Sequence, residues 1–221
     1  MPKTAIILGA SGASGGEVLR LLLNDSRYEK VKLFSRSSIN NKNSKIEEYI
    51  IDLFELEKHA EAFTADEVYC CIGTTKAKTP DKKTYHKIDY GIPVTAAKLA
   101  KANKIPVFIV ISAIGADADS SIFYSRTKGE MQDDVLGANI PTTYILQPSL
   151  IVAERNDSRI MEKLASGFMK LINPVLQGGA AKYRSIKAGN VAKAMVWLAN
   201  NDYKRIFITS DKIEKMSRLS S

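Results

Sequence analysis

The sequence has few residues of the kinds that form disulfides or bind metals. It contains two cysteines and two histidines among 221 residues. Cys70 and Cys71 are neighbours on a predicted strand, where successive side chains point to opposite faces. A disulfide between them and a shared metal site are therefore not expected, and we predict two reduced core residues and no bound metal.

The scarcity of histidine also bears on a serine-hydrolase motif near the N-terminus. Residues 12–16 read Gly-Ala-Ser-Gly-Gly, which fits the nucleophile elbow G-x-S-x-G. That motif requires an acid and then a histidine further along the chain, but His59 and His86 both come early, with no apparent acid to position them. We therefore assign the segment to another function.

Long apolar runs are absent as well. The run at the N-terminus, Ala5–Leu8, is too short for a secretory signal peptide or a membrane span. No linker, repeat or low-complexity tract interrupts the chain, and its 45% hydrophobic and 25% charged residues are typical of globular proteins. We expect one domain over residues 1–221, a cytoplasmic location and no association with a membrane.

The net charge of +8 and the isoelectric point near 9.3 raise the question of a nucleic-acid partner. The lysines are scattered and lack interleaved aromatic residues, which argues against nucleic acid. A basic protein also suits a phosphorylated cofactor and an anionic small-molecule substrate. The densest basic cluster contains Lys76, Lys78, Lys82, Lys83 and Lys87. A protein partner is left open, as is the choice between monomer and homodimer.

The strongest signal is a glycine-rich turn after the first apolar run. Gly9, Gly12 and Gly15 stand three residues apart, and a helical pattern of apolar residues follows them. A dinucleotide-binding fingerprint requires this strand–turn–helix context. Gly9 would form the tight turn, Gly12 would let the backbone approach a pyrophosphate, and Gly15 would let the helix pack close to the sheet. Ser11 and Ser14 could add hydroxyl donors.

Strand patterns alternate with helical patterns along the rest of the chain, which is typical of a parallel sheet covered on both faces. We predict an α/β, doubly wound fold with a mostly parallel sheet of about seven strands. The strands are expected at residues 5–8, 31–34, 48–51, 68–72, 107–111, 142–146 and 205–208. Ligands in such folds bind beyond the carboxyl ends of the strands.

The ends of the second and third predicted strands bear on cofactor choice. An NAD-preferring site usually carries an acidic residue about 20 residues beyond the glycines, but this chain has Arg36 and Ser37 there. Arg36 could bind a ribose 2′-phosphate through two hydrogen bonds, or it could be a solvated loop residue. Asp52 could accept from an adenine amino group or cap the next turn.

The next two strand ends lead to the same crevice. The fourth strand stops at Gly73, where the backbone could pass close to the cofactor ribose, and Ser112 ends the fifth. Tyr124 and Lys128 share one face of a predicted helix. Because a neighbouring ammonium favours the phenolate, Tyr124 could exchange a proton with an oxygen that Ser112 polarises. A solvated Tyr–Lys pair is the alternative.

These motifs resemble those of a known superfamily. GASGASG, Ser112 and Tyr124-x-x-x-Lys128 together look like the atypical branch of the short-chain dehydrogenase/reductase superfamily. The segments CIGTT, ISAIGAD, YSRTKGE and TTYILQPSLI are similar to the Tat-interacting-protein-like group of NAD(P)-binding oxidoreductases. That resemblance implies a single Rossmann domain, NADPH as cofactor and a Ser112–Tyr124–Lys128 active site. Two departures concern substrate binding: Ala113 replaces a second serine, and Gln147 replaces an arginine before Pro148.

The C-terminal part is expected to complete the site. Residues 148–151 would line the nicotinamide end of the crevice, and a helical pattern over 157–176 would form a wall or lid of the substrate site. Asn190 is a candidate N-cap for a helix over 191–198. The basic tail after Ser210 is expected to fray.

We therefore predict an NADP-dependent oxidoreductase that transfers a hydride between NADPH and a small carbonyl or quinone-like substrate. Two alternatives stay open: an NADPH-binding sensor or interaction protein with little turnover, and a flavin or quinone reductase that needs no tyrosine. The predicted catalytic residues are Ser112, Tyr124 and Lys128. The predicted cofactor-binding residues are Gly9, Ser11, Gly12, Ala13, Ser14, Gly15, Arg36, Ser37, Asp52, Leu53, Cys71, Ile72, Gly73, Thr74, Tyr124, Lys128, Pro148 and Leu150.

Overall fold

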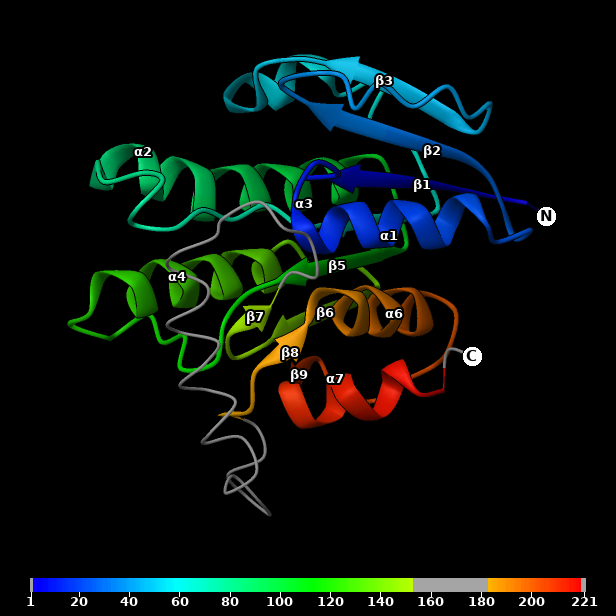
Figure 1. The fold of residues 1–221 in the computed structure, drawn as a ribbon. Coiled ribbons are helices and arrows are strands. Elements are labelled where there is room, and N and C mark those ends of the chain that lie inside the picture. The colour runs from blue at the N-terminus through cyan, green and yellow to red at the C-terminus, as the bar shows by residue number, and fades with distance from the viewer. Residues whose placement is uncertain (1, 153–182, 220–221) are drawn as a thin grey trace.

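A seven-stranded sheet forms the centre of the molecule (Figure 1). The computed structural model describes residues 2–152 and 183–219. The strand order is β3-β2-β1-β4-β5-β6-β9, and every neighbouring pair is parallel, which confirms the predicted doubly wound sheet. The strands are β1 (Lys3–Leu8), β2 (Tyr28–Ser35), β3 (Ile46–Ile50), β4 (Glu67–Cys70), β5 (Val107–Ile111), β6 (Thr142–Gln147) and β9 (Phe207–Thr209).

Helices cover both faces of this sheet (Figure 1). One face carries α1 (Ala13–Leu23), α6 (Ala188–Ala199) and α7 (Ser210–Ser217). The other carries η1 (Leu53–His59), α3 (Ile92–Ala102) and α4 (Phe123–Gly137), with α2 (Lys82–His86) and η2 (Lys87–Gly91) leading into α3. Ala5 and Ile7 of β1 pack against the first layer and Ile6 and Leu8 against the second, because strand side chains alternate between faces. The central strands are apolar for this reason.

The order of the strands creates a switch point between β1 and β4. From β1 the chain proceeds to β2 and β3 on one side, and from β4 it proceeds to β5 and β6 on the other. The connections therefore diverge at the carboxyl ends of β1 and β4, which is where ligands bind in open α/β sheets. The glycine-rich turn and the segment after Cys70 both lie at this edge.

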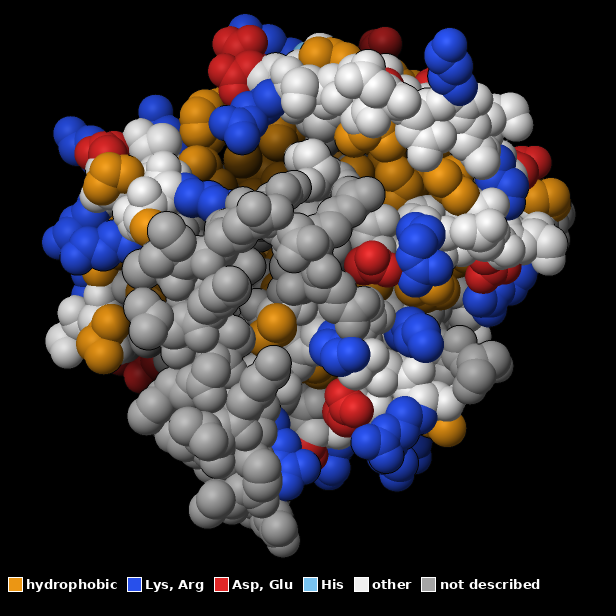
Figure 2. Space-filling view, in the orientation of Figure 1, with side chains coloured by type: hydrophobic (Ala, Val, Ile, Leu, Met, Phe, Trp, Pro, Cys, Tyr) orange, Lys and Arg blue, Asp and Glu red, His pale blue; other side chains and the backbone are white. Residues whose placement is uncertain are grey.

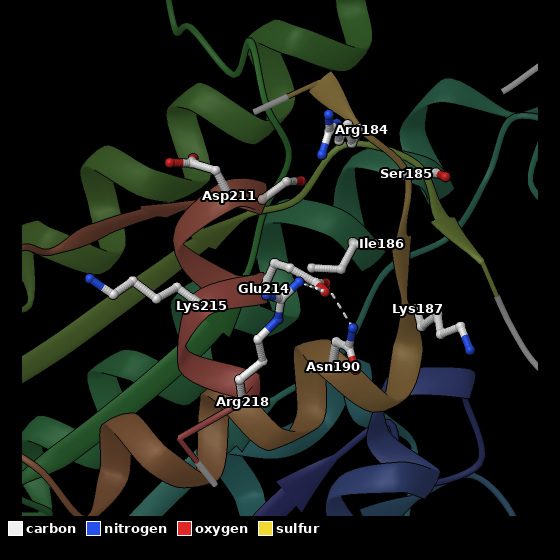
Figure 3. A pocket seen from close by; sticks show the side chains of 10 residues that line it. Arg184, Ser185, Ile186, Lys187, Asn190, Asp211, Glu214, Lys215 and Arg218 are labelled. Carbon is white, nitrogen blue, oxygen red and sulfur yellow. Dashed lines mark hydrogen bonds and ion pairs between the residues drawn. The ribbon is translucent and has the colours of Figure 1, made fainter. Parts of the chain in front are cut away.

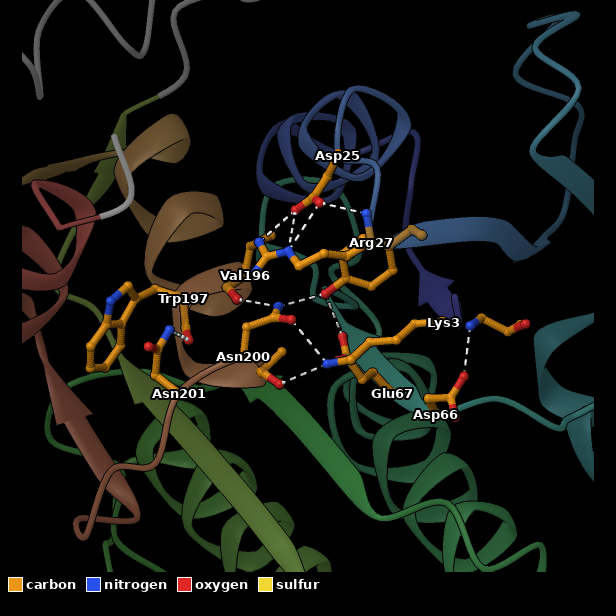
Figure 4. A network of polar contacts seen from close by, with 12 residues as sticks. Lys3, Asp25, Arg27, Asp66, Glu67, Val196, Trp197, Asn200 and Asn201 are labelled. Atoms are coloured by element: carbon orange, nitrogen blue, oxygen red, sulfur yellow. Dashed lines mark hydrogen bonds and ion pairs between the residues drawn. The ribbon is translucent and has the colours of Figure 1, made fainter. Parts of the chain in front are cut away.

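A buried polar network lies at the opposite, amino edge of the sheet (Figure 4). The Glu67 carboxylate is 1% exposed; its Oε2 accepts hydrogen bonds from the hydroxyls of Tyr28 at 2.7 Å and Tyr69 at 2.6 Å. Lys3 forms an ion pair with Glu67, and its Nζ donates to Asn200 Oδ1 at 2.9 Å. The network joins β1, β2 and β4 to the end of α6.

The C-terminal elements differ from the sequence predictions. Helix α6 begins at Ala188 with Lys187 as its cap residue, so the prediction that Asn190 is the N-cap is wrong. Asn190 instead donates to Glu214 Oε2 at 2.8 Å and joins α6 to α7. The prediction of a frayed tail is also wrong, because Ile213 and Met216 stand three residues apart and bury one face of α7. The helix predicted over 157–176 lies outside the described residues.

Two shorter features complete the described part. Strands β7 (Ile151–Val152) and β8 (Ile186–Lys187) form a separate parallel pair. On the face shown in Figure 2, Lys and Arg side chains are dispersed among Asp and Glu. Among the residues that the structure describes, no helix has both the length and the apolar character needed to cross a membrane.

Candidate functional site

The glycine-rich turn joins β1 to α1 without a side-chain cap. Gly9 has a φ of +87°, a conformation that favours glycine, and a Cβ there would come within 2.8 Å of the Cys71 carbonyl oxygen. The Gly12 amide donates to the Gly9 carbonyl at 2.9 Å. A Cβ on Gly15 would collide with the same carbonyl, so α1 begins very close to the end of β1.

This arrangement fits the pyrophosphate of a dinucleotide. Gly12 is the cap residue of α1 and offers no side chain to the first helical N–H groups, and the first turn contains no acidic residue. Ser11, Gly12 and Ala13 are exposed, while Ser14 is buried. Exposed backbone N–H groups and the positive end of the helix dipole are what an anion requires.

The predicted adenosine side of the site lies at the ends of β2 and β3. Arg36 and Ser37 are exposed directly after β2, and the Ser35 hydroxyl donates to the Ser37 carbonyl at 2.8 Å. After β3, Asp52 accepts from the Phe54 amide at 2.9 Å and caps η1, while Leu53 is buried. Of the two roles considered for Asp52, the structure shows the cap.

The segment after β4 lies beside the glycine-rich turn. Cys71 and Ile72 are the residues that a Cβ on Gly9 would touch. A Cβ on Gly73 would lie 3.8 Å from Lys128 Nζ, and the Thr74 amide donates to a buried carboxylate at 2.8 Å. The fold therefore brings this segment both to the turn after β1 and to α4.

The carboxylate that Thr74 contacts belongs to Asp89, a residue that sequence reasoning missed. Asp89 Oδ1 lies 2.8 Å from Lys128 Nζ, and both side chains are almost completely buried. A buried carboxylate needs such a partner, because an unpaired charge away from water is costly. Asp89 follows a basic stretch of the sequence, residues 82–87, and nothing there identifies Lys128 as the lysine that it meets.

Ser112 is buried at the end of β5 and is held by a second missed residue. Gln132 Nε2 donates to Ser112 Oγ at 2.6 Å, and Gln147 Nε2 donates to Gln132 Oε1 at 3.1 Å. With its oxygen receiving this bond, Ser112 can direct its own proton elsewhere. Gln132 follows Lys128 by four residues, as Lys128 follows Tyr124, and this spacing was its sequence signal.

Tyr124 lies at the start of the same helix and is 45% exposed. Its ring centroid is 6.5 Å from that of Tyr85, in an edge-to-face arrangement. Desolvation raises the pKa of Tyr124 above its ordinary value, and the Asp89 carboxylate adds to the rise. The direction is opposite to the one expected from Lys128 alone, because the side chain of Tyr124 is partly desolvated and the Lys128 ammonium is paired with Asp89.

The far end of the predicted crevice follows β6. Pro148 is buried, and its carbonyl accepts from the Ile114 amide at 2.9 Å. Leu150 is exposed, and its carbonyl accepts from the Ile186 amide at 2.9 Å. The wall that was expected from residues 157–176 lies outside the described residues.

A pocket of about 480 Å³ lies elsewhere, between β8, the start of α6 and α7 (Figure 3). Its walls combine basic and acidic side chains, and Glu214 binds both Asn190 and Arg218 there. None of the predicted cofactor or catalytic residues is among the lining residues. We place the site at the switch point, where ligands bind in such sheets. The glycine-rich turn follows β1, Ser112 follows β5, and Lys128 of α4 lies beside Gly73, which follows β4.

Comparison with known proteins shows which family the chain belongs to. Residues 9–167 match the model of a family described as NAD(P)H-binding. Protein FMP52-1, mitochondrial, of Scheffersomyces stipitis is 33% identical over 176 residues, covering 77% of each chain. Protein HTATIP2 of Rattus norvegicus is 31% identical over 170 residues, covering 75% of this chain and 70% of that protein.

The same comparison corrects the predicted location. The FMP52 relatives from Scheffersomyces stipitis, Candida albicans and Debaryomyces hansenii are all named as mitochondrial. The prediction of a cytoplasmic location is therefore wrong. The prediction rested on the short apolar run at the N-terminus, and such a run does not test import into mitochondria.

A solved structure of ElxO with NADP bound has the same fold, with a TM-score of 0.68, 18% identity, and coverage of 95% of this chain and 96% of that one. Fold, family match and relatives agree with the resemblance read from the motifs. The chain belongs to the NAD(P)H-binding family, and its fold is that of the Rossmann-type structures it matches.

Proposed function

We propose that the protein is an NADP-dependent oxidoreductase that reduces a small carbonyl or quinone-like substrate. The observation that carries the proposal is the convergence at the switch point. Lys128 lies next to Gly73, beside the glycine-rich turn, and the same helix positions Ser112 through Gln132. These groups suit binding of a nicotinamide nucleotide and polarisation of a substrate oxygen close to it.

Each residue has a distinct part in the proposed reaction. Ser112 donates a hydrogen bond to the carbonyl oxygen, and Tyr124 gives that oxygen its proton. Lys128, paired with Asp89, lies next to Gly73 and is placed to hold the cofactor, and solvent restores the Tyr124 proton because that side chain is partly exposed. Bound NADPH would supply the hydride for the carbonyl carbon and would be oxidised to NADP⁺.

The preference for NADP rests on the end of β2. Arg36 and Ser37 are exposed there, in the place where an acidic residue would favour NAD. Solved neighbours of the same fold hold NADP in one case and NAD⁺ in another, so the fold does not decide the choice. The cationic side chain of Arg36 supports NADP.

The experiment is NADPH oxidation measured against a panel of aldehydes, ketones, quinones and flavins. Tyr124→Phe keeps the ring and removes the hydroxyl, so carbonyl reduction should fall by roughly 10² to 10⁴ while NADPH affinity is retained. Phe123→Leu, a change to the neighbouring apolar side chain of the helix, is the control and should keep the proton-transfer step. Full carbonyl reduction by Tyr124→Phe would refute the assignment.

One observation favours a second function, an NADPH-binding sensor with little turnover. The Lys128 charge is compensated by Asp89, and Tyr124 has a raised pKa. Tight NADPH binding without oxidation by any compound of the panel would support the sensor.

We also propose that the protein acts in mitochondria, as the names of its yeast relatives indicate for those proteins. Fractionation of cells that express the tagged protein tests this location. Recovery outside the mitochondrial fraction would refute it.

A further inference from the structure

Asp89 lies at an irregular point between two helices. It sits in η2, a π-helical turn that links α2 to α3, and it is 1% exposed. Single π-helical turns inside longer helices are frequent at functional sites. The burial of a carboxylate at such a turn indicates a defined set of partners, because an unpaired one would be strongly destabilising.

Those partners come from two other segments of the candidate site. Asp89 Oδ1 lies 2.8 Å from Lys128 Nζ on α4, and Oδ2 accepts from the Thr74 amide at 2.8 Å. A Cβ on Gly73 would lie 3.6 Å from Asp89 Oδ1, an ordinary contact distance, so the carboxylate lies directly beside the segment after β4. One carboxylate thus fixes the lysine and the segment after β4 together.

The same carboxylate influences the neighbouring tyrosines. Three ionisable groups lie around Tyr124: Asp89 on η2, Tyr85 on α2 and Lys128 one turn along α4. Lys82 is near the preceding residue, with its Nζ 5.5 Å from the centre of the Phe123 ring. The Tyr85 hydroxyl donates to the Thr74 carbonyl at 3.3 Å. The pKa of Tyr124 and the pKa of Tyr85 are both raised, mainly by desolvation and secondly by the Asp89 carboxylate.

We propose that Asp89 is a positioning residue whose buried carboxylate holds Lys128 and the Thr74 amide together and offsets the Lys128 charge one turn from Tyr124, an arrangement that suits proton donation to a substrate. This proposal rests on the proposed function, because that function sets the direction of the reaction, which is reduction of the substrate. An unpaired Lys128 would favour the phenolate, the form that accepts a proton and serves alcohol oxidation. The Asp89–Lys128 pair opposes that form.

Titration of Tyr124 tests this without any substrate. The protein is labelled with ¹³C at the tyrosine Cζ, the Tyr124 resonance is assigned from Tyr124→Phe, and its midpoint is followed by NMR. In the wild-type protein the midpoint should exceed about 10, the ordinary tyrosine value. Asp89→Asn retains an acceptor for the Thr74 amide but loses the charge, so the midpoint should fall by about 1 pH unit or more.

Glu130→Gln is the matched control, since Glu130 lies on α4 and contacts His86, not Lys128. It should leave the Tyr124 midpoint unchanged. Asp89→Glu, which restores the charge, should recover part of the wild-type value. A wild-type midpoint below about 10 overturns the proposal even if Asp89→Asn does not fold. An unchanged midpoint in folded Asp89→Asn overturns it as well.

The outcome is separate from that of the proposed function. A lowered midpoint in Asp89→Asn supports the role of Asp89 even if the panel reveals no turnover, in which case only the oxidoreductase proposal fails. Where reduction is measurable, the alkaline limb of the kcat profile should move to lower pH in Asp89→Asn. A purely structural role would lower activity at all pH values alike.

Discussion

At the scale of single residues, one face of α4 carries three polar side chains of the candidate site. Tyr124, Lys128 and Gln132 stand four residues apart and so occupy successive turns. Each contacts a different element: the ring of Tyr85, the carboxylate of Asp89 and the hydroxyl of Ser112. Substitutions on this face should therefore change one contact at a time.

The first prediction at this scale concerns Gln132 as the donor that orients Ser112. Gln132→Glu replaces the donor with an acceptor, so Ser112 would turn its proton toward the introduced carboxylate rather than toward the substrate. We expect kcat for carbonyl reduction to fall by roughly 10- to 100-fold, with NADPH affinity unchanged. Gln132→Met removes the donor to Ser112 and the acceptor for Gln147 without offering the Ser112 proton a carboxylate, and it should cost less. Equal kcat in wild type and Gln132→Glu would contradict the role.

The second prediction at this scale concerns Arg36 and the cofactor. A hydrogen bond to a charged group contributes about 1.5 to 3 kcal/mol, so Arg36→Ala should weaken NADPH binding about tenfold or more and leave NADH binding nearly unchanged. Calorimetry with both nucleotides measures this. Lys42→Ala removes one exposed positive charge from the following loop and is the control. Equal losses for the two nucleotides would disprove a contact with the 2′-phosphate.

At the scale of elements, the turn between β1 and α1 uses its glycines for different purposes. A Cβ on Gly12 would meet the Gly9 carbonyl oxygen at 3.2 Å, a tight contact that a small shift relieves. A Cβ on Gly15 would collide with the backbone of Gly9. Gly12 is exposed at the start of the helix, where we expect the phosphate to bind, whereas Gly15 allows the helix to approach the strand.

A pair of alanine substitutions separates these purposes. Gly12→Ala should lower the free energy of unfolding by about 1 kcal/mol or less and weaken NADPH binding at least about tenfold. Gly15→Ala should lower the free energy of unfolding by about 1 to 3 kcal/mol or more, because the backbone must move. Urea denaturation and calorimetry measure the two effects. Normal NADPH binding by Gly12→Ala would place the cofactor elsewhere.

At the scale of the whole molecule, binding groups and stabilising polar groups occupy opposite edges of the sheet. The carboxyl edge holds the glycine-rich turn, Ser112 and Lys128. The amino edge holds the Glu67 network, in which Tyr28 and Tyr69 donate to one buried carboxylate oxygen. Changes in that network should therefore affect stability and leave cofactor binding intact.

Alkaline pH tests the network. Burial and the Glu67 carboxylate raise the pKa of Tyr28 and of Tyr69 in the folded protein. A folded-state pKa above the unfolded value means that stability is complete below about pH 10 and falls as the pH rises above it. The urea midpoint should therefore decrease between about pH 10 and 11.5, and less steeply in Tyr28→Phe. Identical slopes in the two proteins would contradict this account.

The local pattern of the sequence was sufficient for the sheet and for the positions of the predicted site residues along the chain. The central strands are apolar on both faces, and the turn Gly9–Gly15 follows the first of them, so their positions followed from neighbouring residues alone. The same reasoning placed Ser112 at a strand end and put Tyr124 and Lys128 on one helical face. These features depend on periodicity, which a single segment contains.

Only the tertiary structure decided which side chains meet. Asp89 and Lys128 are 39 positions apart and pair because η2 packs beside α4. Asn190 was predicted to cap its own helix, but it binds Glu214 of α7. The tail that forms α7 was predicted to fray, but the apolar face of this helix is buried in the core. The raised pKa of Tyr124 also depends on tertiary structure, because it comes first from burial and then from the Asp89 carboxylate, which is distant in sequence. Contacts between distant segments depend on packing, which no single segment specifies.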